Sequence, residues 1–137
     1  MSAMNLGSIS YQAIGKENTI NAGSIPPLCE MLTDQVSEVR TAATRALSSL
    51  AQMKEGKVEI YDLDKLNEII MLLYDTSDQT RLNTVQLIAS VAEYPPAKAK
   101  FAECLPKLQE MVEVEAEPFP LVSRFAQNAI DVITWNP

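Results

Sequence analysis

The 137-residue sequence contains no histidine, which is the side chain most often used as a general base or metal ligand near neutral pH. It has only four glycines, and none of them lies in a glycine-rich phosphate-binding loop. The sequence therefore lacks the residues most often used for acid–base catalysis and metal binding, and the loop most often used for nucleotide binding. We therefore expect no catalytic residue, no metal site and no cofactor, and we expect that the protein is not an enzyme.

Long apolar runs, net positive charge and cysteines are also absent or scarce, and each absence disfavours a class of protein. No apolar run approaches the roughly 20 residues that a membrane-spanning helix requires, and the first residues lack the pattern of a secretory signal. The net charge of −7 disfavours binding to nucleic acid or to anionic membranes. Cys29 and Cys104 are the only cysteines and lie in apolar, helix-like stretches, so we expect buried free thiols and a reducing, cytoplasmic environment.

What the sequence does contain is a repeat with a period of 41 residues. The positions that recur include a hydrophobic set, a serine set and an arginine pair: Leu6, Leu47 and Ile88; Ser8, Ser49 and Ser90; Arg40 and Arg81. A fixed period of this length is typical of a helical solenoid, in which each unit buries its apolar face against its neighbours. Such a fold offers a surface instead of a reaction centre, so the repeat indicates binding or scaffolding.

The spacing of apolar residues predicts one all-α solenoid over residues 1–137. We expect a leading helix at 1–13 and repeats at 17–54, 55–94 and 95–137, the last with a closing helix. Ser24 and Ser37 are predicted helix caps, residues 55–57 are predicted to end the first unit, and residues 94–96 are predicted to stop the helix before them. The third repeat is out of phase, and a longer turn at 113–120 restores the period.

Several segments resemble the armadillo repeat: residues 22–28 (AGSIPPL), 38–43 (EVRTAA) and 46–51 (ALSSLA). The resemblance covers nearly the whole chain. It implies a right-handed solenoid with three helices in each repeat, the third of which lines a concave groove.

A narrower likeness is to the C-terminal part of the armadillo proteins of the ciliary radial spoke, at residues 55–57, 80–84, 92–93 and 129–133. It would imply a structural scaffold subunit of the axoneme in cilia or flagella, part of the cytoskeleton, with other radial spoke subunits as its partners. The alternative is a cytosolic adaptor that captures an extended peptide in the groove.

The residues expected to line the groove are consistent with two interpretations. Armadillo proteins that bind extended peptides resemble one another in a ladder of asparagines on the third helices, whereas the matching positions here are Ser8, Ser49, Ser90 and Val132. Serine at these positions is consistent with simple packing or with a modified peptide-binding ladder. By helical spacing, the candidate groove residues are Arg45, Ser49, Gln52, Gln86, Ser90 and Glu93.

The two ends of the chain and one acidic stretch are further candidates for contact. Leu6 and Ile9 would give the first helix an apolar face that either stacks on another armadillo protein or folds back. Trp135 is predicted to plug the closing helix and, with Leu6 and Ile9, forms the candidate end interfaces. The acidic stretch consists of Glu110, Glu113, Glu115 and Glu117, and reads as a solvated loop or as a docking surface for a basic partner.

Overall fold

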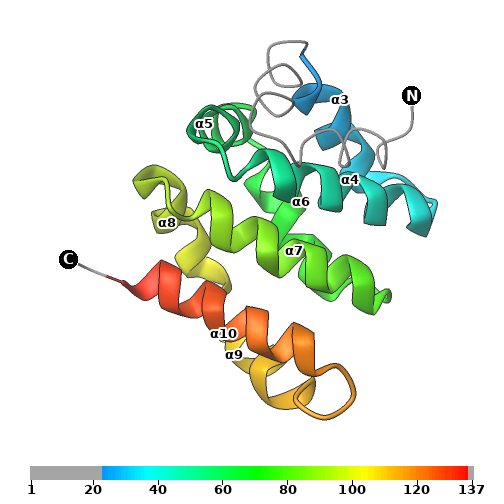
Figure 1. The fold of residues 1–137 in the computed structure, drawn as a ribbon, viewed down its shortest axis with the longest axis vertical. Helices are drawn as coiled ribbons and strands as arrows, with labels where there is room; N and C mark the ends of the chain where they lie inside the picture. The colour runs from blue at the N-terminus through cyan, green and yellow to red at the C-terminus, as the bar shows by residue number, and fades with distance from the viewer. Residues whose placement is uncertain (1–22, 136–137) are drawn as a thin grey trace.

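The computed structural model describes residues 23–135 (Figure 1), so the predicted leading helix at 1–13, with Leu6, Ser8 and Ile9, lies outside the described residues. Within that range the structure consists of helices and turns, without a strand. The first helices are α3 (Ile25–Glu30), which continues into η1 (Met31–Thr33), and α4 (Ser37–Leu50). The next three are α5 (Lys54–Asp62), α6 (Leu66–Met71) with η2 (Leu72–Tyr74), and α7 (Asp78–Val91). The last are α8 (Pro95–Phe101) with η3 (Ala102–Cys104), α9 (Leu105–Val114) and α10 (Pro120–Thr134).

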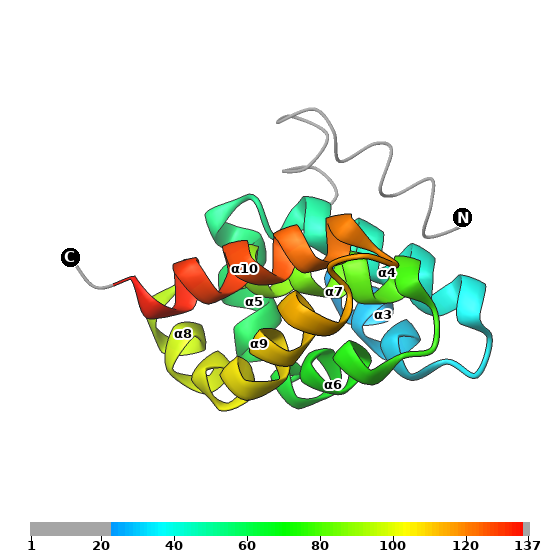
Figure 2. The same ribbon diagram turned by 90° about the horizontal axis from the view of Figure 1, so that it is seen from below.

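These helices build the predicted all-α armadillo-like solenoid. The third helices of successive repeats, α4, α7 and α10, lie side by side in one layer, with α7 packed against both neighbours (Figure 1). Seen from below, α6 and α9 lie on the other side of this layer (Figure 2). Among residues 23–135, no helix is long and apolar enough to cross a membrane.

The core between the layers is mostly aliphatic, as the low aromatic content of the sequence requires. Ala43 and Ala46 are fully buried on α4, and their small side chains let α4 approach α7 closely. Cys29 and Cys104 are buried free thiols, which confirms the prediction for both residues. Burial raises the pKa of Cys29 to about 12 and that of Cys104 to about 11, so both side chains stay protonated near neutral pH.

The N-terminal ends of the helices confirm some of the predicted capping and first-turn residues and correct others. Prolines occupy the first turn of α3, where a missing N–H costs little. Ser37 is not a cap, because α4 already begins at that residue, and the carboxylate of Asp34 accepts from the Val36 amide at 2.8 Å instead. Ser77 does cap α7, since its hydroxyl accepts from the Thr80 amide at 3.3 Å. The pattern therefore identified the turns but not every capping atom.

Two segments, one predicted to end the first unit and one predicted to stop a helix, lie instead in the first helices of the following repeats. Residues 55–57 are part of α5, and the prolines at 95–96 form the first turn of α8, whereas α7 has already ended at Val91. Gly56 explains the first case. A Cβ at this position would lie 2.1 Å from the carbonyl oxygen of Leu50, so only glycine lets α5 cross the end of α4 so closely.

The turn between the second and third helices differs in length among the repeats. It spans residues 34–36 and 75–77 in the first two repeats but residues 115–119 in the third. This confirms the longer turn that the phase shift predicted. The two extra residues place Pro118 and Phe119 at the surface beside η2.

Candidate functional site

The predicted groove residues occupy the third-helix layer. Arg45, Ser49 and Gln52 follow one another at spacings of four and three, so they share a face of α4 and its C-terminal turn. Gln86, Ser90 and Glu93 occupy the matching positions on α7, 41 residues later. Arg45, Gln52 and Glu93 are exposed, and the other three are half-buried. We call these six residues the third-helix face; whether it binds a peptide stays a prediction.

The serine ladder is short in the described part of the chain. Ser49 and Ser90 form no side-chain hydrogen bond with any residue in 23–135, whereas Thr44 and Thr84 donate back to carbonyls of their own helices. Neither serine hydroxyl is therefore occupied by a hydrogen bond to a carbonyl of its own helix. Val132 takes the same position on α10 and is half-buried, so the ladder has no polar group there.

Glu93 forms an ion pair with Lys57, a residue that was not among the candidate groove residues. The Lys57 ammonium lies 3.2 Å from the Glu93 carboxylate and donates to the Ala51 carbonyl at 2.6 Å. It thus joins the C-terminal end of α4 to that of α7. Lys98 follows Lys57 by one 41-residue period and donates to the Trp135 carbonyl at 2.9 Å. That spacing is the signal by which the two lysines could have been found.

Trp135 does not plug the closing helix, because 64% of it is exposed. Helix α10 ends at Thr134, and the backbone of Trp135 is extended, which turns its side chain out of the helical pattern. Ile133 is the last buried residue of α10. The Lys98 ammonium lies 5.5 Å from the centre of the indole ring. The role of Trp135 as an end interface stays a prediction.

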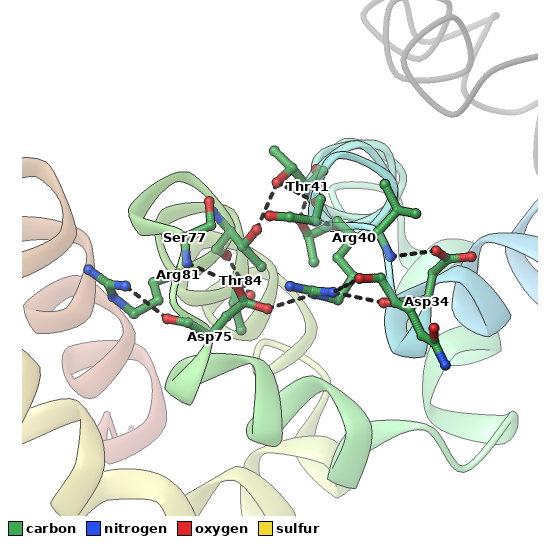
Figure 3. Close-up of polar contacts among 12 residues, drawn as sticks. Asp34, Arg40, Thr41, Asp75, Ser77, Arg81 and Thr84 are labelled. Atoms are coloured by element: carbon green, nitrogen blue, oxygen red, sulfur yellow. Dashed lines mark hydrogen bonds and ion pairs between the residues drawn. The ribbon is translucent and has the colours of Figure 1, made fainter.

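Polar contacts join one repeat to the next through Arg40 (Figure 3). The Arg40 Nε donates to the Asp75 carboxylate at 2.8 Å, and its Nη1 donates to the carbonyls of Asp34 and Gln35 at 2.8 and 3.1 Å. One guanidinium therefore fixes the turn of its own repeat and binds the turn of the next. We call this arrangement an arginine bridge.

Arg81 repeats the arginine bridge 41 residues later. Its Nη1 donates to the Asp75 carbonyl at 2.8 Å, and its Nε and Nη2 both donate to the carboxylate of Glu115. This forked geometry is the strong form of an arginine–carboxylate pair. Glu115 is consequently buried, with 6% exposed, which corrects its prediction as part of a solvated acidic loop. Glu110 and Glu113 are exposed but lie on α9, so of the four only Glu117, exposed in the 115–119 turn, fits the predicted solvated loop.

Asp75 shows the electrostatic effect of the two bridges. Burial by itself raises the pKa of Asp75, but hydrogen bonds from Arg40 and the Ser77 amide, together with the charges of Arg40 and Arg81, outweigh it. The net result is a pKa below the ordinary value of an aspartate. The carboxylate is therefore ionised wherever the protein is folded near neutral pH.

A polar seam runs beside the first bridge, between α4 and α7. The hydroxyls of Thr41 and Thr80 lie 2.8 Å apart, and the Asn83 amide donates to the Thr41 carbonyl at 3.0 Å and to the Thr44 hydroxyl at 3.3 Å. These directional bonds fix the register of the two helices. No group of three or more histidine, cysteine, aspartate or glutamate side chains in residues 23–135 is placed to hold a metal ion.

Comparison with known proteins relates one segment of the sequence, and the fold of the chain, to armadillo repeat proteins. The sequence model of the armadillo/β-catenin-like repeat matches residues 15–52. No curated protein matches the chain.

Similar solved structures include an engineered protein with a TM-score of 0.88 and 26% identity, covering 96% of this chain and 55% of that protein. A designed armadillo repeat protein aligns with a TM-score of 0.83 and 25% identity, covering 94% and 55%. Another, solved in complex with the peptide (KR)4, aligns with a TM-score of 0.82 and 25% identity over the same shares. The chain thus spans about half the length of these structures, and its fold is that of an armadillo solenoid.

Proposed function

We propose that this armadillo solenoid is a non-enzymatic protein-binding scaffold that serves as a structural subunit of the axonemal radial spoke. The observation that supports the scaffold is the pair of arginine bridges, which tie the turns of three successive repeats to one another. A scaffold must hold its neighbours at a fixed spacing, and buried directional contacts between repeats resist the bending that a solenoid otherwise permits.

The cellular setting rests on sequence likeness alone. The segments at 55–57, 80–84, 92–93 and 129–133 look like the C-terminal part of radial spoke head protein 14. Under this proposal the chain lies in the cilium or flagellum, and its partners are other radial spoke subunits. A further armadillo protein could stack on its N-terminal end.

The proposal is tested by pulling down the tagged full chain from detergent-extracted cilia, with salt washes and mass spectrometry of the proteins that remain bound. We expect retention together with radial spoke subunits. Trp135→Ala and Leu6→Asp, which alter the predicted end interfaces, should weaken retention, while Ser49→Arg on the third-helix face should leave it unchanged. Release of the unmodified chain into the soluble fraction would contradict the radial spoke role.

A second candidate function is capture of an extended basic peptide on the third-helix face. Two facts favour it: the similar designed protein is complexed with (KR)4, and this chain carries a net charge of −7. Fluorescence anisotropy with a labelled (KR)4 peptide tests it directly. If the face binds the peptide, Ser49→Arg and Ser90→Arg should weaken binding by charge repulsion, and Arg45→Glu should strengthen it. Equal affinities in all variants would rule out this face.

A further inference from the structure

A hollow of about 340 Å³ lies between the second and third repeats, where the second helices turn into the third helices. Its walls come from η2, from α9 and from the long 115–119 turn. The apolar wall residues are Leu73, Tyr74, Met111, Val114, Pro118 and Phe119. We call this site the turn hollow. It exists because the third repeat has the longer turn, which supplies Pro118 and Phe119.

Three of these wall residues are large hydrophobic side chains that face solvent. Tyr74 is 60% exposed, Val114 is 62% exposed and Phe119 is 38% exposed. Scattered exposed hydrophobic residues are normal, but several that line one hollow are typical of an interaction site. Since the three come from separate segments of two repeats, the folded structure brings them together.

The walls are held in position before any partner binds. The Arg81 guanidinium, fixed by the second arginine bridge, lies 5.5 Å from the centre of the Phe119 ring. Between α9 and η2, the Lys107 ammonium lies 4.5 Å from the centre of the Tyr74 ring. A binding site that is already ordered loses little conformational entropy on association.

Charge selects the kind of partner. The three carboxylates that line the turn hollow are each paired with a cation: Asp75 with Arg40, Glu115 with Arg81, and Glu110 with Lys107 at 3.4 Å. The exposed Glu113 and Glu117 lie next to lining residues in the sequence and form no ion pair with the described residues. The surroundings are therefore negative, which favours a partner that carries positive charge.

We propose that the turn hollow binds a basic segment of a protein partner, with one leucine-sized apolar side chain in the hollow and flanking lysines or arginines against the exposed Glu113 and Glu117. This deepens the proposed scaffold function, on which it rests, by naming a docking chemistry. The site is separate from the third-helix face, because Ser90 lies nine residues beyond Arg81, or about 13 Å along α7.

The test is a titration of the 15N-labelled full chain with short synthetic peptides, followed by NMR. The probe is a nine-residue acetylated peptide with a central leucine, two arginines on each side and glycine or serine elsewhere. One matched peptide replaces the leucine with glycine, and another replaces the arginines with glutamates. We expect the probe to shift the amides of residues 73–75 and 107–119, and each matched peptide to bind at least about tenfold more weakly.

Variants of the protein localise the contact. Val114→Lys places a charge in the apolar wall and should weaken probe binding about tenfold or more. Val36→Lys is the matched control, because Val36 is 49% exposed but does not line the hollow, and it should change the affinity less than twofold. The Glu113→Gln, Glu117→Gln double variant should lower the affinity at low salt, with the difference shrinking as ionic strength rises.

Three results would overturn the proposal: no shift in residues 73–75 and 107–119, equal binding of the glycine peptide, or an unchanged affinity in Val114→Lys. Shifts confined to Arg45, Ser49, Gln86 and Ser90 would favour the third-helix face instead. None of these results bears on retention in the axoneme, so failure of the turn hollow and failure of the scaffold function are distinguishable. Circular dichroism of each variant excludes loss of folding as the cause.

Discussion

The two junctions between repeats are held together by different sets of side chains. At the first junction, between α4 and α7, Arg40 reaches Asp75 in a three-residue turn, and the polar seam of Thr41, Thr80 and Asn83 lies beside it. At the second, between α7 and α10, Arg81 reaches Glu115 in the longer turn. The buried side chains of α10 are all apolar: Val122, Ala126, Ala129 and Ile133.

The comparison shows that the arginine bridge is kept while the turn that supplies its acceptor varies. Glutamate is one methylene longer than aspartate and reaches the guanidinium from a turn of different length. The repeat can therefore change phase without losing its link to the previous repeat. The surplus residues of the longer turn are then free to build another feature, which here is the turn hollow.

The largest effect is expected from Gly56→Ala at the first junction. The added Cβ would meet the Leu50 carbonyl oxygen at 2.1 Å, and because Cβ is fixed to the α5 backbone and the carbonyl is part of the α4 backbone, the clash is relieved only by moving α5 away from α4. We expect a loss of about 3 kcal/mol in the free energy of unfolding, the upper end of the usual cost of overpacking. Urea denaturation followed by circular dichroism measures it.

The control is Ala97→Gly, since Ala97 takes the equivalent place in α8 one period later and is fully buried. It should cost only about 1 kcal/mol, the usual penalty for glycine in a helix. If the two substitutions cost the same, the close approach at the first junction is not specific to Gly56.

Arg81→Ala should have the next largest effect. It leaves Glu115 buried without its partner, and this arginine and this glutamate have side chains only 15% and 8% exposed. Breaking a fully buried pair costs about 3–5 kcal/mol, so we expect about 2 kcal/mol for this partly exposed one. The loss should appear in hydrogen exchange as faster opening of α10 and the 115–119 turn.

Arg40→Ala is the matched variant and should cost less, about 1 kcal/mol, because Asp75 keeps its bond from the Ser77 amide and remains near Arg81. Equal costs for Arg40→Ala and Arg81→Ala would mean that the two bridges are energetically interchangeable, contrary to the comparison.

How far the sequence predicts this molecule differs between fold and site. The 41-residue period and the apolar spacing predicted the all-α solenoid, the closing helix and the longer third turn, because solenoid repeats are encoded locally. The buried cysteines followed from the apolar segments around them. The caps were less predictable: Ser77 caps α7, whereas Val36 stands one period earlier at the N-cap position of α4 and Ser37 is already inside that helix.

The contacts between repeats could not be read from the sequence in the same way. The period of Arg40 and Arg81 was visible, but their acceptors lie 35 and 34 residues away, and only the fold brings them together. For the same reason Glu115 was taken for one more exposed acid. Trp135 was misplaced because its exposure depends on where α10 ends, and helix ends are hard to fix from the sequence.

A smaller effect is expected when the polar seam is removed by Asn83→Ala. The substitution takes away the bonds to the Thr41 carbonyl and the Thr44 hydroxyl, but Thr44 keeps its bond to the Arg40 carbonyl. We expect a loss of about 1–1.5 kcal/mol in unfolding free energy. Gln127→Ala, which removes an exposed hydrogen bond on α10, should cost less than about 0.5 kcal/mol. Similar losses in both would show that the seam adds nothing to the first junction.

The smallest effect is expected in how the free energy of unfolding depends on pH in acid. In this respect Asp75 should differ from the exposed carboxylates. Because the folded pKa of Asp75 lies below its ordinary value, its charge stabilises the fold above about pH 4 and stops doing so as the pH falls through the folded pKa. Asp75→Asn should therefore lower the free energy of unfolding by about 1 kcal/mol at pH 7, and this difference should shrink below about pH 4.

Urea denaturation between pH 7 and pH 3 measures the difference between the two proteins. Glu117→Gln, at an exposed acid, serves as the control and should differ little from the unmodified chain at any pH, since exposed charges contribute little to stability. A gap for Asp75→Asn that stays constant down to pH 3 would mean that the substitution acts through packing and not through the charge held between the two arginine bridges. A gap that closes with acid would show that the charge of Asp75, bound by Arg40 and close to Arg81, stabilises the first junction.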